Sequence, residues 1–258
     1  MNPGPTAGIE AFPRAHPGAA RAPGGLPHSS PPRFRPRRSR WLLAALCACV
    51  ATGSRAEETQ LRTGLTLRFP LTESVSLFSY AELGISDRTV NPSRYLLRQG
   101  VTWQARTNLS LQLNHVFSES ESFSAAVGHD VFRQQQRVEA AVTPSFTLGD
   151  RFTLNARTRL EHRWLEGQAN NLRTRHRFEL EHPAGAWLPA AGFFHSYEFF
   201  FDWSANRNSA HRVLPAGISW EFGPRTDVRA YYYIERSRGG GDWENRHVFF
   251  TQWSYSFR

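Results

Sequence analysis

The chain has 258 residues and a formal net charge of +9, and all 31 of its basic side chains are arginine because it contains no lysine. Residues 1–56 carry eight arginines and one acidic residue, whereas residues 57–258 carry 23 arginines and 21 acidic residues. The basic character therefore belongs to the N-terminal segment, and the charge of the remainder excludes nucleic acid as an expected partner.

Two segments precede the body of the chain. Residues 1–40 are rich in Pro, Ala, Gly and Arg and hold nine of the 16 prolines, so we expect a disordered basic leader, or an over-extended translation start. Residues 41–56 combine an apolar run, too short to span a bilayer as a helix, with the small residues Ser54 and Ala56. Together with the preceding arginines this pattern predicts a secretory signal peptide that is cleaved after Ala56.

Both cysteines, Cys47 and Cys49, fall inside the predicted signal peptide. A lipid-modified Cys49 is a weaker alternative interpretation of this segment. The predicted mature domain, residues 57–258, is then free of cysteine, which excludes a disulfide framework and a thiolate metal site. No motif in it indicates a cofactor or any other metal site.

Residues 57–258 read as a succession of strands, because apolar and polar residues alternate and no stretch sustains a period of 3.6. We predict twelve strands, with ten as the fallback because residues 122–132 also fit a loop. The candidate ranges are 63–69, 74–83, 94–106, 108–117, 122–132, 136–148, 151–164, 172–182, 194–203, 212–222, 227–236 and 246–257.

The strand lengths favour an all-β fold in the form of a single antiparallel transmembrane β-barrel. Residues 151–164 alternate over fourteen positions, and twelve strands in this domain leave about 17 residues for each strand and its loop. Sandwich strands are shorter, at about 5–6 residues. A soluble β-sandwich remains the structural alternative, since alternation alone does not say which face is buried.

Residues 155–182 show the alternation most clearly, with charged side chains in one phase and apolar side chains in the other. In a barrel the charged phase lines the lumen, which predicts as lumen-lining residues Arg157, Arg159, Glu161, Arg163, Arg173, Arg175, Arg177, Glu179 and Glu181. The opposite phase places His162, His176 and His182 toward lipid.

Charge pairing predicts the register of this hairpin. Opposite charges across a strand pair are favourable and like charges are not. We therefore expect Glu161 opposite Arg177, Arg159 opposite Glu179, and Arg157 opposite Glu181.

The chain end predicts an assembly signal and a topology. Trp253, Tyr255 and Phe257 share one face and resemble the C-terminal signal of outer-membrane proteins, although Arg258 follows the last aromatic residue. With an even strand count both ends face the periplasm. In that count the tight turns at 70–73 and 106–108 fall on the extracellular side, where short turns are unusual.

The strand patterns in "RTRLEHR", "LRTRHRFEL", "SYEFFF", "HRVLPAGISWEF" and "DVRAYYY", with the terminal aromatic strand, resemble the domain-of-unknown-function 2490 family of bacterial outer-membrane barrels. The resemblance covers most of residues 57–258 and is clearest from residue 150 onward. His211-Arg212 stands where the family pattern suggests Asn-Arg. The resemblance implies a fold and a place in the outer membrane of Gram-negative bacteria, and no established activity.

Two functional hypotheses follow for such a barrel. The first is a narrow passive, porin-like channel for small anionic solutes, because an arginine-lined lumen attracts anions. The second is a non-conducting structural or assembly barrel in which the same residues form a salt-bridged filling. Its one unusual connector is "HPAGAWLPAAGF" with Trp187. Expected partners are outer-membrane lipid, the outer-membrane assembly machinery and, for a channel, small anionic solutes; the oligomeric state stays open.

A lipid-modifying enzyme is the least favoured hypothesis. His115 follows Asn114 and Ser196 follows His195, but adjacent residues in a strand point to opposite faces and so cannot form a nucleophile and its base. Metalloprotease, hydrolase, P-loop and dinucleotide motifs are absent from the sequence. We therefore expect no enzymatic activity.

Overall fold

The computed structural model describes residues 58–87, 92–124, 129–185, 188, 190–239 and 242–257. The predicted leader, signal peptide and cleavage site, both cysteines, Trp187 and Arg258 lie outside these residues. Within them no helix is long and apolar enough to cross a membrane.

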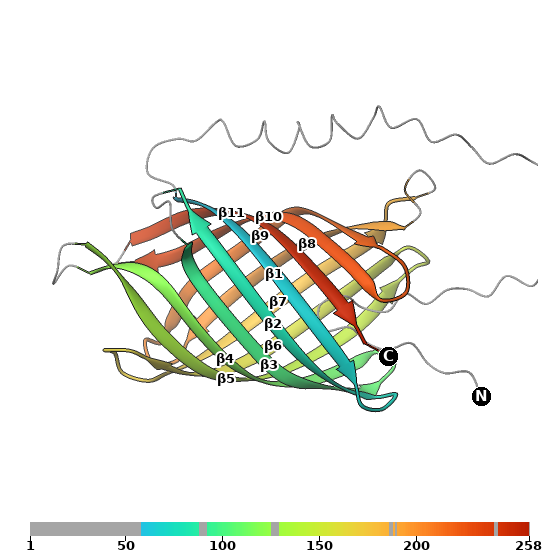
Figure 1. The fold of residues 1–258 in the computed structure, drawn as a ribbon, viewed down its shortest axis with the longest axis horizontal. Helices are drawn as coiled ribbons and strands as arrows, with labels where there is room; N and C mark the ends of the chain where they lie inside the picture. The colour runs from blue at the N-terminus through green and yellow to red at the C-terminus, as the bar shows by residue number, and fades with distance from the viewer. Residues whose placement is uncertain are drawn as a thin grey trace, which may run out of the picture. The chain divides into compact units, whose positions relative to one another are not determined.

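Eleven strands form a closed barrel in the described part of the chain (Figure 1). Neighbours in sequence pair antiparallel all around the wall, and β1 closes the barrel by pairing in parallel with β11. The strands are β1 Glu58–Pro70, β2 Val75–Ser86, β3 Pro92–Arg106, β4 Leu109–Ser124, β5 His129–Leu148, β6 Phe152–Leu165, β7 Asn171–Pro183, β8 Ala191–Asp202, β9 Arg207–Glu221, β10 Thr226–Gly239 and β11 Asp242–Ser256.

The predicted counts of twelve and ten strands are both wrong for the described residues. The error lies at 122–132, where β4 and β5 continue far past the lengths predicted for them and form one tall hairpin, with Ser124 opposite His129. Alternation continues through both strands, so a sequence pattern does not show where one long hairpin replaces two shorter ones.

The odd count gives the barrel two distinct ends. At the C-end, β11 finishes together with four tight connections: 71–74, 107–108, 149–151 and 222–225. At the N-end lie the start of β1 and the connections 166–170 and 203–206. The turns that an even count placed on the wrong side thus lie at the same end as the C-terminus, which removes that inconsistency.

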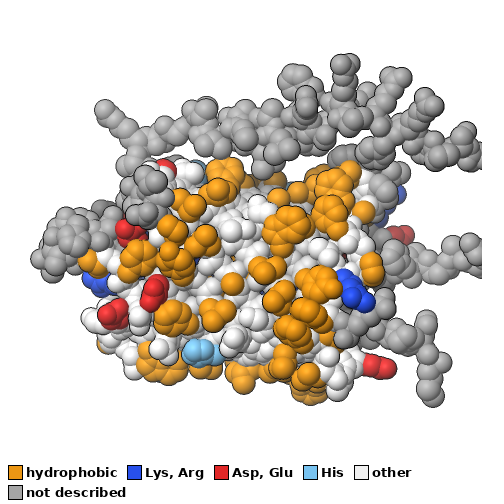
Figure 2. Space-filling view, in the orientation of Figure 1, with side chains coloured by type: hydrophobic (Ala, Val, Ile, Leu, Met, Phe, Trp, Pro, Cys, Tyr) orange, Lys and Arg blue, Asp and Glu red, His pale blue; other side chains and the backbone are white. Residues whose placement is uncertain are grey.

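The outer face of the barrel is apolar. Large hydrophobic side chains point outward and are exposed along the strands, among them Leu65, Leu113, Leu160 and Phe178. Figure 2 shows them spread across the barrel wall, with charged side chains toward its two ends. A soluble sandwich would bury this face, so the closed barrel with an apolar exterior excludes that alternative.

The inner face is polar and densely packed. Buried polar or charged residues outnumber buried hydrophobic ones, and among the largest side chains with almost no exposed surface are Arg159, Glu139, Glu161 and Gln252. This organisation, apolar outside and polar inside, is the one that a bilayer selects for a barrel.

One hydrophobic cluster also lies inside the barrel. It joins side chains from strands on opposite sides of the barrel. They are Phe78, Tyr80, Leu96, Val116, Phe194, Leu214, Tyr233, Val248 and Phe250, with Tyr231 packed against them. The apolar residues of the chain therefore serve two surfaces, the lipid-facing wall and a plug-like core.

Candidate functional site

The interior of the barrel is the candidate site, and the nine charged residues predicted on the hairpin β6–β7 all lie buried or half-buried there. Arg159 and Glu161 are 2% and 0% exposed, and Arg175 and Glu179 are also buried. The remaining predicted residues, Arg157, Arg163, Arg173, Arg177 and Glu181, are half-buried in the same phase.

The predicted register of this hairpin is wrong. Arg157 pairs with Arg177, Arg159 with Arg175, and Glu161 with Arg173, a slip of four residues from the register that charge pairing favours. Two opposed arginine pairs would destabilise an isolated hairpin. They are tolerated here because carboxylates from β5 and β8 reach the same guanidinium groups.

Glu139 on β5 is the first of these carboxylates. It is fully buried and receives Arg159 Nη1 at 3.0 Å, Arg137 Nε at 2.6 Å and Arg98 Nε at 3.6 Å. Asn114 Nδ2 donates a fourth contact at 3.3 Å. A buried carboxylate with three cations around it holds β3, β5 and β6 together from inside.

Glu161 and Glu198 continue the network along β6–β8. Glu161 accepts two hydrogen bonds from Arg173 at 2.8 and 2.6 Å and one from Arg175 at 3.0 Å. Arg175 also donates hydrogen bonds to both oxygens of Glu198 at 3.0 Å, and Arg212 lies 3.7 Å from the same carboxylate. Arg175 is thereby fixed between two carboxylates despite facing Arg159 across the strands.

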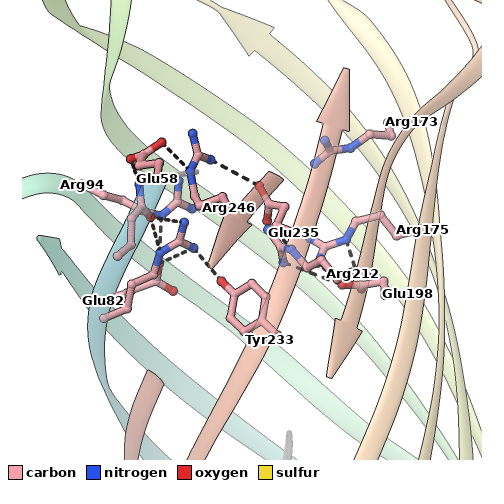
Figure 3. A network of polar contacts seen from close by, with 12 residues as sticks. Glu58, Glu82, Arg94, Arg173, Arg175, Glu198, Arg212, Tyr233, Glu235 and Arg246 are labelled. Atoms are coloured by element: carbon pink, nitrogen blue, oxygen red, sulfur yellow. Dashed lines mark hydrogen bonds and ion pairs between the residues drawn. The ribbon is translucent and has the colours of Figure 1, made fainter. Parts of the chain in front are cut away.

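A second group of charges lies across the seam of the barrel, which is the parallel pairing of β1 with β11 (Figure 3). Arg246 bridges Glu58 at 2.8 Å and Glu235 at 3.4 Å, and Glu235 also pairs with Arg212. Since Arg212 contacts Glu198 as well, the seam and the β6–β8 network form one connected system.

Arg62 and Glu82 extend this system to β1–β3. Arg62 donates to the Tyr233 hydroxyl at 2.9 Å and lies 3.6 Å from Glu82. Glu82 accepts from Arg94 Nε at 2.8 Å and from the Tyr80 hydroxyl at 2.7 Å. Figure 3 shows Glu82 and Arg94 close together, with Tyr233 approaching from another strand.

A third group of charges lies at the C-end of the interior, beside the ring of Phe194. Arg229 on β10 reaches across to β7, with Nη2 2.9 Å from Glu179 and 2.8 Å from Glu181, and Arg177 pairs with Glu179 at 2.8 Å. The Arg229 guanidinium lies over the Phe194 ring at 3.9 Å. The ion pairs of Arg229 join β10 to β7, two strands that are not neighbours, so they pass through the interior of the barrel.

The Phe194 ring lies against the neighbouring strand β9, because its register partner there is a glycine without a side chain. Phe194 pairs with Gly217, where an added Cβ would come within 2.4 Å of the ring. The register shifts between Phe194 and Ser196, beside Pro215, whose missing N–H suits an irregular site in the sheet.

The interior formed by the described residues contains at least two cavities. The central one has a volume of about 80 Å³ and is lined both by β2–β3 (Tyr80, Glu82, Arg98) and by β6–β8 on the opposite wall. The second, of about 330 Å³, lies nearer the N-end. Arg173, Arg175 and Arg212 there surround the Phe200 ring at 5.0, 4.5 and 5.1 Å.

Sequence reasoning on one hairpin missed the carboxylates that organise the interior. They are Glu58, Glu82, Glu139, Glu198 and Glu235. Each occupies the polar phase of its strand, so extending the face assignment from one hairpin to all strands would have found them. Their pairing across the lumen would still have required the three-dimensional arrangement.

The histidines and the paired polar residues that were weighed for catalysis lie apart. Asn114 faces the interior whereas His115 is exposed on the outside, and His195 contacts the Pro215 carbonyl while Ser196 lines the central cavity. His176 contacts the Thr158 hydroxyl at 3.1 Å, and His182 packs against Phe152 and Phe193. No group of three or more potential metal ligands occurs in the described ranges.

The terminal aromatic residues lie at the C-end beside β1. Trp253 is exposed on the outer face, Tyr255 packs edge-on to Phe257, and Phe257 stacks on Phe69 at 4.4 Å. The Phe257 amide also donates to the Arg68 carbonyl at 2.9 Å, which extends the parallel pairing of β11 with β1 by one residue.

The apolar wall, polar filling and closed sheet define the class of transmembrane β-barrel proteins. The chain belongs to the family described as "protein of unknown function (DUF2490)", which matches residues 59–246. This confirms the family resemblance of the strand patterns.

Comparison with other known proteins adds little. No curated protein matches the chain. Two structures of in-vitro folded OmpT, an outer membrane protein of Vibrio cholerae, one of them a trimer form, share 12% and 11% sequence identity with it at a TM-score of 0.36. Each match covers 66% of this chain and 58% of the other, so this chain spans less than two thirds of their length. A likeness at this level carries no argument.

Proposed function

We propose that the protein is an integral outer-membrane barrel that does not conduct solutes, because its own side chains fill the lumen. The carrying observation is the central cavity. Strands β2–β3 and β6–β8 lie on opposite walls, yet they line a single space of only about 80 Å³. That volume accommodates a few water molecules, at about 30 Å³ each in the liquid.

The packing on either side of this cavity supports the proposal. Toward the C-end, Arg229 crosses the lumen to Glu179 and covers Phe194, which is 1% exposed. Around the cavity, Glu139 and Glu161 are fully buried beneath the arginines that they hold. A solute that passed through would have to break these buried ion pairs, and separating one costs about 3–5 kcal/mol.

The arginines that motivated the channel hypothesis have another role in this proposal. Opposite charges in a low-dielectric interior attract strongly, and the guanidinium groups of Arg175 and Arg229 each contact two carboxylates. They act as a filling that fixes the strands, as in barrels of few strands whose interior is occupied by side chains.

The remaining parts of the proposal follow from the exterior. The apolar wall supports a position in a bilayer, and the aromatic C-terminal strand supports recognition by the outer-membrane assembly machinery. The protein has no enzymatic activity in this proposal, because Asn114 and His115, like His195 and Ser196, face opposite sides of the wall.

Planar-bilayer conductance of the refolded domain, residues 57–258, tests the proposal. Folding is first established by the shift in gel mobility on heating, and a porin in the same bilayer serves as the positive control. We expect no conductance steps from the folded barrel. Stable, anion-selective steps would contradict the proposal and restore the channel hypothesis.

A further inference from the structure

The larger cavity near the N-end is unusual for its charge. Nine arginines and two glutamates line its volume of about 330 Å³. Its position near that end follows from its lining residues, since Arg163 is two residues before the end of β6 and Arg173 is two residues after the start of β7. The cavity is large enough for a small organic anion.

The two lining carboxylates do not balance these arginines. Glu82 is shared by Arg94 and Arg62, and Glu235 is shared by Arg212 and Arg246. The fully buried Glu139 and Glu161 do not line the cavity and are likewise each shared by several arginines. The cavity therefore has an excess of positive charge.

Arg163 is the centre of this imbalance. Its Nη2 donates to Gln135 Oε1 at 2.9 Å, but its Nε is buried without a hydrogen-bond partner, and no carboxylate in the described residues lies within ion-pair distance of it. Directly opposite on β5 is Arg137, which contacts the Glu139 carboxylate through its Nε. Two like charges therefore face each other across β5 and β6, which is unfavourable.

We propose that this cavity binds a small multivalent oxyanion, such as the phosphate of a phosphate ester, between Arg137, Arg163 and Arg173. Guanidinium groups bind phosphate through paired, charge-assisted hydrogen bonds, and an anion at this position supplies the partner that Arg163 lacks. The three arginines come from the adjacent strands β5, β6 and β7, so their spacing is set by the sheet.

The surroundings prepare the site before a ligand arrives. Arg173 is held by two hydrogen bonds to Glu161, and its guanidinium lies over Phe200. Arginines that are already oriented lose little conformational freedom on binding, which favours affinity. The proposal does not depend on whether the lumen conducts, so this test and the conductance test can fail independently.

Calorimetric titration of the refolded barrel with inorganic pyrophosphate tests the site, with glucose as the neutral probe and added chloride at matched ionic strength. We expect saturable binding of pyrophosphate alone. Arg163→Gln should weaken it by about 10- to 100-fold, the effect of losing one charge-assisted hydrogen bond. Arg151→Gln, an exposed turn position at the C-end, is the matched control and should bind as the original protein does.

Thermal unfolding without pyrophosphate separates a ligand-binding role of Arg163 from a structural one. Because Arg163→Gln removes the repulsion from Arg137, its melting temperature in anion-free buffer should equal or exceed that of the original protein. Pyrophosphate should raise the melting temperature of the original protein and of Arg151→Gln, and leave that of Arg163→Gln nearly unchanged. Absence of binding at millimolar pyrophosphate, equal binding by Arg163→Gln, or a lower melting temperature for that variant in anion-free buffer would each overturn the proposal.

Discussion

At the scale of single residues, the interior is organised by buried carboxylates that each serve several arginines. Glu139 and Glu161 have no exposed surface, and each contacts at least two guanidinium groups. A buried ion is tolerated only when its partners are in place, and removing one partner leaves the other charges uncompensated. These glutamates therefore keep arginines together that would otherwise repel one another.

Glu161→Gln is predicted to destabilise the barrel strongly. The change keeps the side-chain shape but leaves Arg173 without a carboxylate and Arg175 with Glu198 alone. We expect the free energy of unfolding to fall by about 3–5 kcal/mol, measured by urea titration of tryptophan fluorescence in lipid vesicles. The control is Glu166→Gln in the exposed β6–β7 connection, where an amide oxygen can still accept from Gln134 N. Equal stabilities of the two variants would refute a structural role for Glu161.

At the scale of strands, the outer face carries histidines that form hydrogen bonds with tyrosines on the neighbouring strand. His211 Nδ1 lies 2.8 Å from the Tyr197 hydroxyl, His247 Nδ1 lies 2.5 Å from the Tyr232 hydroxyl, and both pairs also stack. Lipid offers no hydrogen bonds, so a polar atom on this face is costly unless a neighbour satisfies it. The pairs explain how β8–β11 keep histidine on an otherwise apolar wall.

Tyr197→Phe is predicted to cost about 1 kcal/mol of unfolding free energy, because it leaves His211 without its cross-strand partner. Tyr95→Phe is a matched control, since Tyr95 also points outward but its hydroxyl has no hydrogen-bond partner among the described residues. Urea unfolding of both variants in the same vesicles measures the difference. A loss for Tyr95→Phe as large as that for Tyr197→Phe would show that the hydroxyl contact contributes nothing specific.

The hairpin β6–β7 shows how far the sequence predicts these elements. Alternation places Arg159 and Glu161 on the same face as Arg175, and all three are buried inside the barrel. It does not fix the register, because the rule of opposite charges considers only two strands, whereas Glu139 and Glu198 reach the arginines from β5 and β8. The strand count failed for a similar reason, since a tall hairpin and two short ones share the same alternation.

At the scale of the whole molecule, the parallel seam between β1 and β11 determines the topology. Every other neighbouring pair of described strands is antiparallel, and the seam runs in register from Glu58 opposite Arg246 to Arg68 opposite Ser256. Polar side chains join the two strands inside the barrel, where Arg246 pairs with Glu58 and Gln252 donates to Thr66. An even-stranded barrel would have no such parallel neighbours, so the seam is the feature that separates eleven strands from ten or twelve.

A disulfide across the seam is the sharpest test of this topology. Thr63 lies opposite Thr251, both point outward, and residues 57–258 contain no cysteine that would interfere. Neighbouring strands are about 4.8 Å apart, within the Cα separation that a disulfide spans. Thr63→Cys with Thr251→Cys should therefore cross-link on mild oxidation, visible as an altered mobility of the folded protein that a reductant reverses. Thr59→Cys with Thr251→Cys should not, because Thr59 pairs with His247, four residues or about 13 Å along the strand. Failure of the first pair in a folded barrel would contradict the parallel closure, and with it the placement of the start of β1 and the end of β11 at opposite ends of the barrel.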